Sequence, residues 1–389
     1  MIQKDICIGI DASNISGGGG LTHLRELLNN FEPKKFNIDN VVLWTGKDTN
    51  KYLPDKKWLI KKSPNMIDKN IIYRIFWQIF FLKKSLNKHK CDILFVPGGI
   101  YLGFFEPFVS MSQNLLPFEK KEYLRFGFSI TTLRFILLRI FQSITFKRSA
   151  GVIFLTEYAK QVVNKQVGKI QSSVLIPHGI NSNFFLKPRN QIDYTKELGQ
   201  KKIKIIYVSI INHYKHQWNV VKAIEKIRKE HDYLISLDLI GPNYPSAKVK
   251  LDIQVQLSDP LNEWINYHES VPHEELKNFY FDADMAVFAS SCENLPIILL
   301  EKMAAGLPII CSNKGPMPEV LGSSGIYFDP EDYMNLSTQI LKLIESRQLR
   351  TSLSEKSFQI SKNYDWTNTS NETFKYLTNI ILDNNNMRK

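Results

Sequence analysis

The chain has few cysteines, and their spacing suits neither a metal site nor a disulfide framework. Four of its 389 residues are cysteines, at positions 7, 91, 292 and 311, with no CxxC pair and no His/Cys cluster. We therefore expect reduced core thiols, no bound metal and no cofactor of the protein's own. The beginning, MIQKDICIGIDAS, lacks the basic start and long apolar region of a signal peptide, so we expect a cytoplasmic protein.

Long uninterrupted apolar runs are also missing. The most apolar segments are NIIYRIFWQIFFLKK (70–84) and FSITTLRFILLRIFQSITFKR (128–148), and both contain Arg or Lys. A transmembrane helix needs about 18 or more consecutive apolar residues, so neither segment is expected to span a membrane. Two interpretations stay open: ordinary buried helices, or contact with a bilayer surface through a basic aromatic face.

Acidic residues are scarce in the first half of the chain. Residues 1–190 hold 28 Lys and Arg against 13 Asp and Glu, a net charge of +15, whereas residues 191–389 hold 22 against 25, a net charge of −3. This asymmetry favours an anionic partner for the first half, either a membrane surface or nucleic acid, with a merely solvated basic surface as the alternative. No nucleic-acid-binding motif is recognisable, so we expect no nucleic acid partner.

Short apolar runs that alternate with helical patterns fill the chain. Continuously apolar runs of this kind are typical of strands buried on both faces of a parallel sheet, which predicts an α/β fold. The expected strands are 6–11, 40–45, 92–97 and 151–156 in the first half, and 202–209, 234–241, 286–290, 307–312 and 325–329 in the second.

The length predicts two domains, each a Rossmann-like, doubly wound sheet. A polar stretch with Pro188, KPRNQIDYTKELGQKK (187–202), separates the two sets of strands. We therefore expect domains at 1–190 and 191–365, and a C-terminal helix at 366–389 that packs back on the first domain. Ligands of such sheets bind beyond the carboxyl ends of the strands, so the two domains are expected to face an interdomain cleft.

Two loops that follow predicted strands have the chemistry of an anion site. Four glycines at 17–20 lie between a strand and a helical pattern, where exposed backbone amides favour a phosphate, although a plain flexible turn is the alternative. Neither GxGxxG nor a P-loop is present, which argues against a dehydrogenase or an NTPase. Lys215 follows the first strand of the second half, at a position where a diphosphate could reach it, and a merely solvated lysine is the alternative.

The stretch SSCENLPIILLEKMAAGLP (290–308) has two glutamates eight positions apart. On one continuous helix they would diverge, but a helix that starts at Pro296 with Asn294 as its cap leaves Glu293 in the loop and Glu301 inside the helix. Both carboxylates are then expected to face one ligand, with the free amides of residues 295–298 between them. One loop glutamate and one surface glutamate is the alternative.

These residues resemble a known family. The segment SSCENLPIILLEKMAAGLPIICSNKGPMPEVLG is similar to the Glu-x7-Glu signature of the retaining nucleotide-sugar glycosyltransferases with the GT-B fold, often called family four. The glycine loop at 17–20, IPHGIN (176–181), YKHQ (214–217), VPHEELKNFY (271–280) and YDW (364–366) resemble the family in the same order. The resemblance therefore covers most of the chain.

The resemblance implies a role for each matching residue. Lys215 would neutralise the donor diphosphate, Glu293 would lie near the donor sugar, and Glu301 would bind the ribose hydroxyls. Backbone amides hold sugar and phosphate in this family, and the loop beside the base and the N-domain glycine loop complete the donor site. The matching positions are Asn294, Leu295 and Ile297 for the amides, Val271 and Pro272 for the base, and Gly18 and Gly19 for the glycine loop.

Two departures from the family pattern concern catalysis. Many members have Arg ahead of the lysine, where this chain reads VSIINHYK, and many have a His-Asp pair where this chain reads SQNLLPFEK. Gln113 and Asn114 cannot be general bases, but they can hydrogen-bond a sugar or an acceptor. The SQN-LPF form is similar to enzymes of bacterial surface-polysaccharide assembly, such as O-antigen, lipopolysaccharide or capsule synthesis.

The resemblance predicts a metal-independent glycosyltransferase, hexosyltransferase in type. It would move a sugar with retention from a nucleoside-diphosphate sugar to a glycan or a lipid-linked glycan, with Lys215 and Glu293 as its catalytic residues. Its place would be the cytoplasm or the cytoplasmic face of the inner membrane, in peripheral contact with anionic lipid. The alternative is a non-catalytic assembly protein of the same fold that binds a nucleotide sugar or a glycan.

Overall fold

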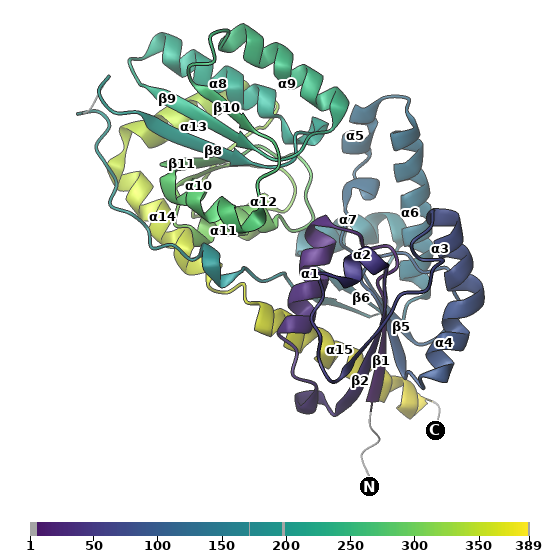
Figure 1. Ribbon diagram of the computed structural model, residues 1–389. Coiled ribbons are helices and arrows are strands. Elements are labelled where there is room, and N and C mark those ends of the chain that lie inside the picture. Colours follow the sequence, from purple (N-terminus) through teal and green to yellow (C-terminus); the bar gives the residue numbers. More distant parts are fainter. Residues whose placement is uncertain (1–5, 171, 197–198, 388–389) are drawn as a thin grey trace. The chain divides into compact units, whose positions relative to one another are not determined.

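The computed structural model describes residues 6–170, 172–196 and 199–387 (Figure 1). The chain forms two compact units: unit 1 comprises residues up to 120, 128–179 and from 365 onward, and unit 2 comprises 121–127 and 180–364. The division at 179 lies a little before the predicted boundary at 190, and the excursion of 121–127 into unit 2 was not predicted. Parts of the predicted linker (197–198) and terminal helix (388–389) lie outside the described residues.

Unit 1 is built on a parallel seven-stranded sheet with the order β3-β2-β1-β4-β5-β6-β7. The order reverses between β1 and β4, which makes this a doubly wound sheet with its switch point there. The strands are β1 (Ile6–Asp11), β2 (Ile38–Trp44), β3 (Leu59–Lys62), β4 (Ile93–Val96), β5 (Phe108–Met111), β6 (Gly151–Phe154) and β7 (Ser173–Leu175).

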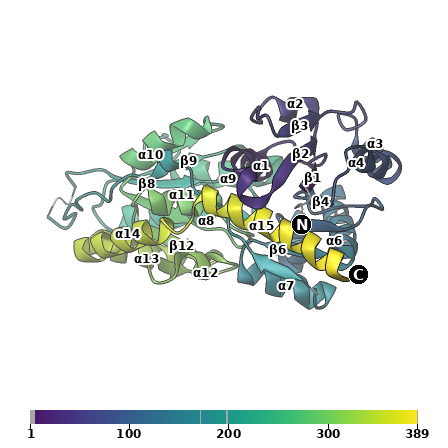
Figure 2. The same ribbon diagram turned by 90° about the horizontal axis from the view of Figure 1, so that it is seen from below.

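Helices on both sides of this sheet complete unit 1, and Figure 2 shows α1 and α4 on opposite sides. The helical elements are α1 (Gly18–Asn29), η1 (Pro33–Phe36), α2 (Lys47–Asn50), α3 (Ile71–Trp77), the π-helix η2 (Gln78–Leu82), α4 (Lys83–Lys88), η3 (Leu116–Phe118), α6 (Ile130–Arg148), α7 (Glu157–Val167) and α15 (Trp366–Met387). Between η3 and α6, α5 (Lys120–Tyr123) and η4 (Leu124–Phe126) lead into and out of the excursion into unit 2.

The terminal helix α15 belongs to unit 1 and lies beside α1 (Figure 2). The rings of Phe31 and Phe374 stack with their centroids 3.5 Å apart, and the Ser370 hydroxyl donates to the carbonyl oxygen of Leu27 at 2.9 Å. The last helix is therefore a structural part of the first unit.

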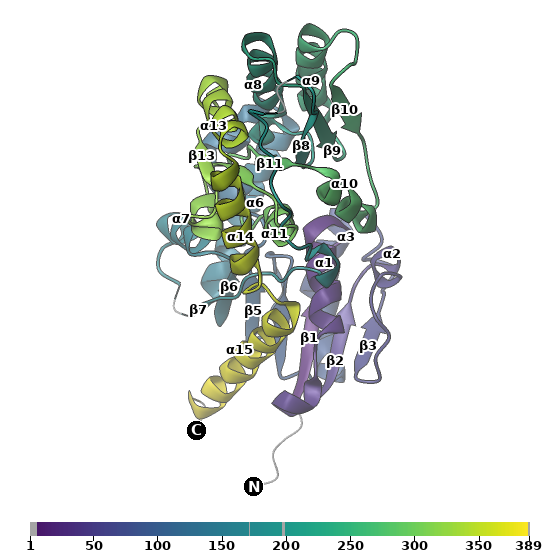
Figure 3. The same ribbon diagram turned by 90° about the vertical axis from the view of Figure 1, so that its left-hand side faces the viewer.

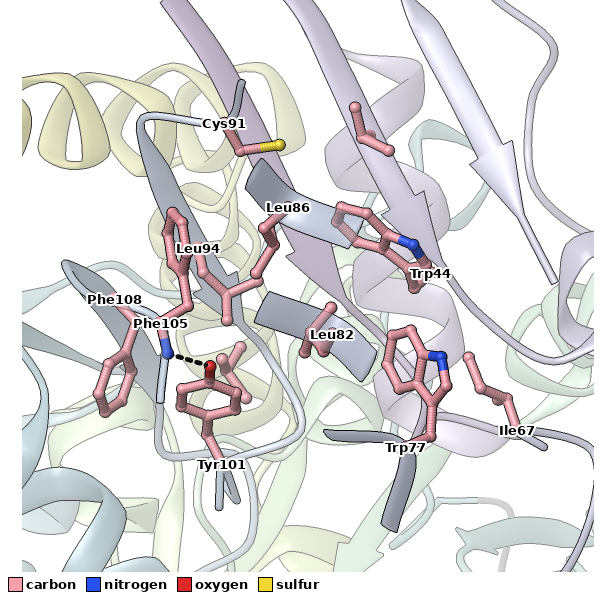
Figure 4. Packing of buried hydrophobic residues seen from close by; sticks show 12 residues of the cluster. Trp44, Ile67, Trp77, Leu82, Leu86, Cys91, Leu94, Tyr101, Phe105 and Phe108 are labelled. Atoms are coloured by element: carbon pink, nitrogen blue, oxygen red, sulfur yellow. Dashed lines mark hydrogen bonds between the residues drawn. The ribbon is translucent and has the colours of Figure 1, made fainter. Parts of the chain in front are cut away.

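An apolar layer packs the sheet of unit 1 against α3, η2 and α4 (Figure 4). Trp44 from β2, Trp77 from α3 and Leu86 from α4 are all buried in it. Tyr101 is buried there too, and its hydroxyl oxygen accepts a hydrogen bond from the backbone N–H of Phe105 at 2.8 Å. This layer includes Val96, the last residue of β4, where one loop of the switch point begins.

Unit 2 contains a parallel six-stranded sheet with the order β10-β9-β8-β11-β12-β13, and its switch point lies between β8 and β11. Helices α8 and α9 cover one face and α10 and α11 the other (Figure 1), and α14 packs beside α11 (Figure 3). The strands are β8 (Ile203–Val208), β9 (Ile235–Ile240), β10 (Ile265–His268), β11 (Met285–Phe288), β12 (Ile309–Ser312) and β13 (Ile326–Phe328). The helical elements are η5 (Ser182–Phe184), η6 (His213–Lys215), α8 (Gln217–Glu230), α9 (Pro245–Ser258), η7 (His273–Glu275), α10 (Leu276–Asp282), α11 (Ile297–Ala304), α12 (Met317–Leu321), α13 (Tyr333–Glu345) and α14 (Arg347–Ser361).

The predicted α/β fold with two doubly wound sheets is confirmed, and each of the nine predicted strands is present within a few residues of its expected bounds. The strands that the apolar pattern missed are β3, β5, β7 and β10. Three of these are edge strands with partly exposed residues, so their sequences lack a continuous apolar run. The fourth, β5, is fully buried but has only four residues, one of which is Ser110.

Candidate active site in unit 2

The candidate site lies where β8 and β11 end. These two strands are neighbours in the sheet and run parallel, so the loops that follow them leave the same edge. The loop after β8 passes through η6, which ends at Lys215, and the loop after β11 contains Glu293 and leads into α11. In open α/β sheets the crevice outside such a switch point is the usual ligand site.

Lys215 and Glu293 form an ion pair between these two loops. The side chain of Lys215 is 8% exposed and that of Glu293 is 16% exposed, so both charges are largely withdrawn from water. The Tyr207 hydroxyl donates to the carbonyl oxygen of Lys215 at 2.7 Å and holds the end of η6 against the sheet. Removing one partner of such a pair leaves a buried charge without compensation, which is costly.

Glu301 lies just over one turn inside α11, as predicted, and is 1% exposed. Its Oε1 lies 2.7 Å from Nε2 of His273, and its Oε2 accepts a hydrogen bond from the Tyr280 hydroxyl at 3.2 Å. The Tyr280 phenol is fully buried, and burial together with the nearby Glu301 charge raises its pKa well above the usual value. Tyr280 therefore stays a hydrogen-bond donor, which fixes the orientation of the carboxylate.

The start of α11 differs from the sequence expectation. The helix begins at Ile297, Pro296 occupies the N-cap position, and no side chain caps it, so the predicted cap at Asn294 is wrong. Pro296 has an extended backbone (φ −79°, ψ 93°), which ends the loop before the helix turns. The first amides of a helix have no carbonyl partner within it. The amides of Ile297 and Ile298 therefore provide partial positive charge beside Glu293.

The loop with Val271 and Pro272 connects β10 to η7, and both residues are at least partly exposed. It leads directly into His273, the histidine that contacts Glu301. The structure therefore brings this loop next to the buried glutamate. No role was predicted for His273 from the sequence, although its place directly after Pro272 in a motif loop marks it as a candidate.

A second group of predicted residues lies at the strand ends of unit 1. Gly18 and Gly19 form the start of α1, and Gly18 has a φ of +60°, a left-handed conformation that favours glycine. A Cβ added to Gly18 would meet nothing within 4 Å, whereas one added to Gly20 would lie 3.2 Å from Oε1 of Gln113. Gln113 is thus adjacent to the glycine loop. The side-chain oxygen of Asn114 accepts from the backbone N–H of Leu116 at 3.1 Å, a local structural role.

The excursion of residues 121–127 also reaches the candidate site of unit 2. Ser291, in the loop after β11, donates to Oε2 of Glu122 at 2.5 Å and lies 3.0 Å from Nε2 of His216. Burial lowers the pKa of His216 to about 3, so this imidazole is neutral. Arg125 holds Glu122 through Nε at 2.8 Å and also pairs with Glu331. The sequence did not indicate this network, because its members are far apart in the chain.

The described part of the chain has neither a clustered set of metal-ligand side chains nor a membrane-spanning helix. Within 6–170, 172–196 and 199–387, no group of three or more His, Cys, Asp or Glu side chains is arranged to hold a metal ion. Among the helices in those same ranges, none combines the length and apolar character that crossing a bilayer requires. The four cysteines are free thiols.

Comparisons with known proteins agree with the geometry of unit 2. Residues 189–359 match the model of the family described as Glycosyl transferases group 1. An O-antigen chain mannosyltransferase B from Escherichia coli is 33% identical over 110 residues, which are 28% of this chain and 29% of that protein. The chain therefore spans less than a third of that curated relative.

Two solved structures resemble the whole chain. A sucrose-phosphate synthase from Thermosynechococcus elongatus has a TM-score of 0.77 at 15% identity and covers 97% of this chain and all of its own. The Anabaena protein Alr3699/HepE, solved with UDP and glucose, has a TM-score of 0.68 at 13% identity and covers 96% of this chain and all of its own. At these identities the likeness shows the fold, which is GT-B. Residues 189–359 are thus similar to a glycosyltransferase family, within a chain that has the fold of these solved structures.

Proposed function

We propose that the protein transfers a sugar, with retention of configuration, from a nucleoside-diphosphate sugar to a glycan or lipid-linked glycan acceptor. The observation that carries this proposal is the buried pair of Lys215 and Glu293 at the switch point of unit 2, beside the start of α11. A cation, a carboxylate and helix amides meet there. These are the groups that a donor's diphosphate and sugar hydroxyls require.

The donor diphosphate would replace Glu293 as the partner of Lys215. In the structure the Glu293 carboxylate compensates the lysine charge, and a bound diphosphate would take over that role together with the amides of Ile297 and Ile298. Glu293 would then be free to accept hydrogen bonds from the donor sugar. The ribose hydroxyls would lie toward Glu301, and Val271 and Pro272 would flank the base. Asn294 and Leu295 would line the sugar and phosphate path.

Catalysis in this arrangement is mainly electrostatic. The acceptor hydroxyl oxygen attacks the anomeric carbon from the face that the leaving group departs, the bond from that carbon to the diphosphate oxygen breaks, and the hydroxyl proton passes to the diphosphate. Lys215 and the helix amides stabilise the charge that grows on the leaving diphosphate. Since a diphosphate oxygen receives the proton, the step needs no histidine at position 113.

The acceptor side is assigned to unit 1. Gln113 lies next to the glycine loop of Gly18 and Gly19; the loop follows β1 and Gln113 follows β5, with β4 between these two parallel strands. Its amide can hydrogen-bond a sugar hydroxyl but cannot remove a proton. Asn114, whose side-chain oxygen is engaged with Leu116, would act through its amide nitrogen or through the shape of the loop.

The acceptor is proposed to be a component of a bacterial surface polysaccharide, reached at an anionic membrane. The E. coli relative is named for O-antigen chain synthesis. Helix α6 exposes a stripe of aliphatic residues that are alternately three and four positions apart. The exposed fractions of these residues range from 88% to 42%. The stripe comprises Ile130, Leu133, Leu137, Ile140 and Ile144. Arg134 and Lys147 on the same helix are exposed as well, which suits the interface of an anionic bilayer.

The test is a panel of nucleoside-diphosphate sugars incubated with the protein and membranes that carry candidate acceptors. We expect release of free nucleoside diphosphate from one donor, dependent on acceptor, and a product whose new bond retains the donor's anomeric configuration by NMR. Donor binding without release across acceptors would favour the non-catalytic assembly protein. An inverted product would contradict the retaining mechanism, and absence of donor binding would contradict the site itself.

A further inference from the structure

Lys302 is a fully buried lysine that the proposed mechanism does not use. It follows Glu301 on α11, and its side chain is 0% exposed. Its neighbours in sequence, PIILLEKMAAG, are almost wholly apolar, so the residue lies on a helix face that packs against the sheet. Lysine is among the residues least often buried completely, since its ammonium loses its hydration there. A buried lysine at this position requires an explanation.

The amine of Lys302 ends beneath the candidate donor site. Its Nζ donates to the carbonyl oxygen of Val208, the last residue of β8, at 3.3 Å. It lies 4.7 Å from the centroid of the Phe288 ring, and Nζ of Lys215 lies 5.4 Å from the same centroid. Two amines therefore lie near one aromatic ring at the ends of β8 and β11.

The charges around Lys302 leave its own charge only partly compensated. Glu301 from α11 and Glu293 from the loop after β11 attract it, and Lys215 from η6 repels it. Cys311 from β12 and Tyr207 from β8 complete its surroundings; burial raises the pKa values of both groups, so they are neutral near pH 7. Because Glu293 already pairs with Lys215, no carboxylate is paired directly with Lys302 among the described contacts.

Burial, with a further contribution from Lys215, lowers the pKa of Lys302 from 10.5 to about 7. Near neutral pH the free protein therefore holds a mixture of charged and neutral amine. An anion bound at Lys215 would shift this mixture toward the charged form, since an opposite charge nearby favours the ammonium. A diphosphate brings at least two negative charges to a place where Lys215 supplies only one positive charge.

We propose that Lys302 is a positioning residue of the donor-phosphate site, whose buried amine takes up a proton when a diphosphate binds beside Lys215. The inference rests on the proposed function. The extra positive charge strengthens the hydrogen bond to the carbonyl oxygen of Val208 at the end of β8, and it helps to balance the charge of the diphosphate. The amine does not touch the donor; it acts through the end of β8 and through the electrostatic field at the strand ends.

The test measures proton uptake when UDP binds. Calorimetric titrations of the protein with UDP at pH 8 are run in phosphate and in Tris, which differ in ionisation enthalpy, so the difference in heat counts the protons that are taken up. UDP is already fully ionised at this pH because its second phosphate pKa is about 6. GDP, ADP, CDP and TDP are titrated in the same way if UDP does not bind.

We expect uptake of a substantial fraction of one proton at pH 8 and little uptake at pH 6, where Lys302 is already charged. In Lys302→Met the uptake should vanish and the Kd should no longer rise between pH 7 and pH 9. Lys226→Met, which removes a partly exposed lysine from α8, is the matched control and should behave as the wild type. Uptake that is absent in the wild type, or unchanged in Lys302→Met, would overturn the inference.

A measurement of unfolding without nucleotide helps to distinguish failure of this inference from failure of the proposed function. Compared with Lys302→Met, the wild type should gain stability as pH rises from 7 toward 10.5. Over this range the amine of the unfolded chain is still protonated, whereas the buried amine is neutral. Folding therefore releases a proton, and a higher pH favours that release. A flat difference in unfolding free energy over that range would overturn the titration of Lys302 itself. Binding of a nucleotide without proton uptake contradicts only this inference. Binding of no nucleotide contradicts the proposed function on which it rests.

Discussion

The ammonium of Lys215 and the carboxylate of Glu293 pair across the ends of two neighbouring parallel strands, so one interaction fastens both loops of the switch point. The pair is largely buried, and each charge is the main compensation for the other. Any anion that binds Lys215 must therefore compete with Glu293. This competition separates the effect of Glu293 on nucleotide binding from its effect on turnover.

Replacement of Glu293 by Gln should affect binding and turnover in opposite directions. Without the competing carboxylate, Lys215 is free for a diphosphate, so the free nucleoside diphosphate should bind at least as tightly as it does to the wild type. Turnover of the nucleotide sugar should fall by a factor of about 100 or more, since the sugar loses a charged hydrogen-bond partner. Calorimetry and a release assay measure the two quantities. Glu345→Gln, on the exposed side of α13, is the control. Weaker nucleotide binding with normal turnover in Glu293→Gln would contradict the role proposed for Glu293.

Glu301 should discriminate between nucleotides with and without a ribose 2′-hydroxyl. The wild type is expected to bind the 2′-deoxynucleoside diphosphate about tenfold more weakly than the ribonucleotide, which corresponds to one charged hydrogen bond. Glu301→Gln keeps the shape and an acceptor for the Tyr280 hydroxyl but loses the negative charge. It should bind both nucleotides with similar, weak affinity. Equal discrimination in the wild type and the variant would show that the ribose lies elsewhere.

The aliphatic stripe of α6 should bind anionic vesicles. Leu133 and Leu137 are 56% and 45% exposed, so Leu133→Gln with Leu137→Gln should leave the melting temperature nearly unchanged. Cosedimentation with phosphatidylglycerol vesicles should fall severalfold, because the variant loses the apolar area that would be buried in the bilayer interface. Val249→Gln with Ile253→Gln, on α9, removes equally exposed aliphatic residues and is the matched control. Loss of self-association in the α6 variant, with vesicle binding intact, would instead identify the stripe as a dimer contact.

Acid should weaken unit 1 through a buried histidine pair. Nδ1 of His23 and Nδ1 of His178 lie 3.0 Å apart, and both rings face Trp366. Burial lowers the pKa of His23 to about 3, and burial together with His23 lowers the pKa of His178 well below its usual value. Both are thus neutral when folded and gain protons on unfolding below pH 6.5. This stability is fully present above pH 6.5 and is lost as pH falls toward 3, by up to about 1.4 kcal/mol per pH unit for each histidine.

Denaturant unfolding at pH 7 and pH 5 measures this loss. His23→Phe should reduce the difference between the two pH values, since it removes one group that must lose its proton to fold. At pH 7 the variant should be no more stable than the wild type, because the contact with His178 is lost. A variant with the same pH dependence as the wild type would show that other groups cause the acid sensitivity.

The sequence predicted the interior of the fold better than its edges, for a physical reason. Central strands such as β1 and β8 are covered on both faces, so their residues are continuously apolar and easy to recognise. Edge strands such as β3 and β10 are half exposed, and their mixed sequences resemble loops. The excursion of residues 121–127 makes long-range contacts from Glu122 to Ser291 and from Arg125 to Glu331, which no local pattern records.

The residues of the candidate site, too, could be predicted only in part from the sequence. Lys215 and Glu293 could be marked as candidates because each follows a recognisable strand, and parallel strands bring such positions to one edge. Their direct pairing, however, was not predicted, nor was the contact of His273 with Glu301. Lys302 was overlooked because its place in an apolar helix gave no sign of whether its amine reached water or the strand ends.

The most direct test of the donor site compares nucleotide binding by the wild type, Lys215→Met and Lys226→Met. Methionine keeps the length and apolar stem of the lysine, so Lys215→Met should still fold, with a lowered melting temperature because Glu293 loses its partner. The account predicts that Lys215→Met weakens binding of the donor's nucleoside diphosphate by about 10- to 100-fold, the loss of one charged contact, while Lys226→Met binds normally. Unchanged affinity in a folded Lys215→Met protein would contradict the assignment of the donor site.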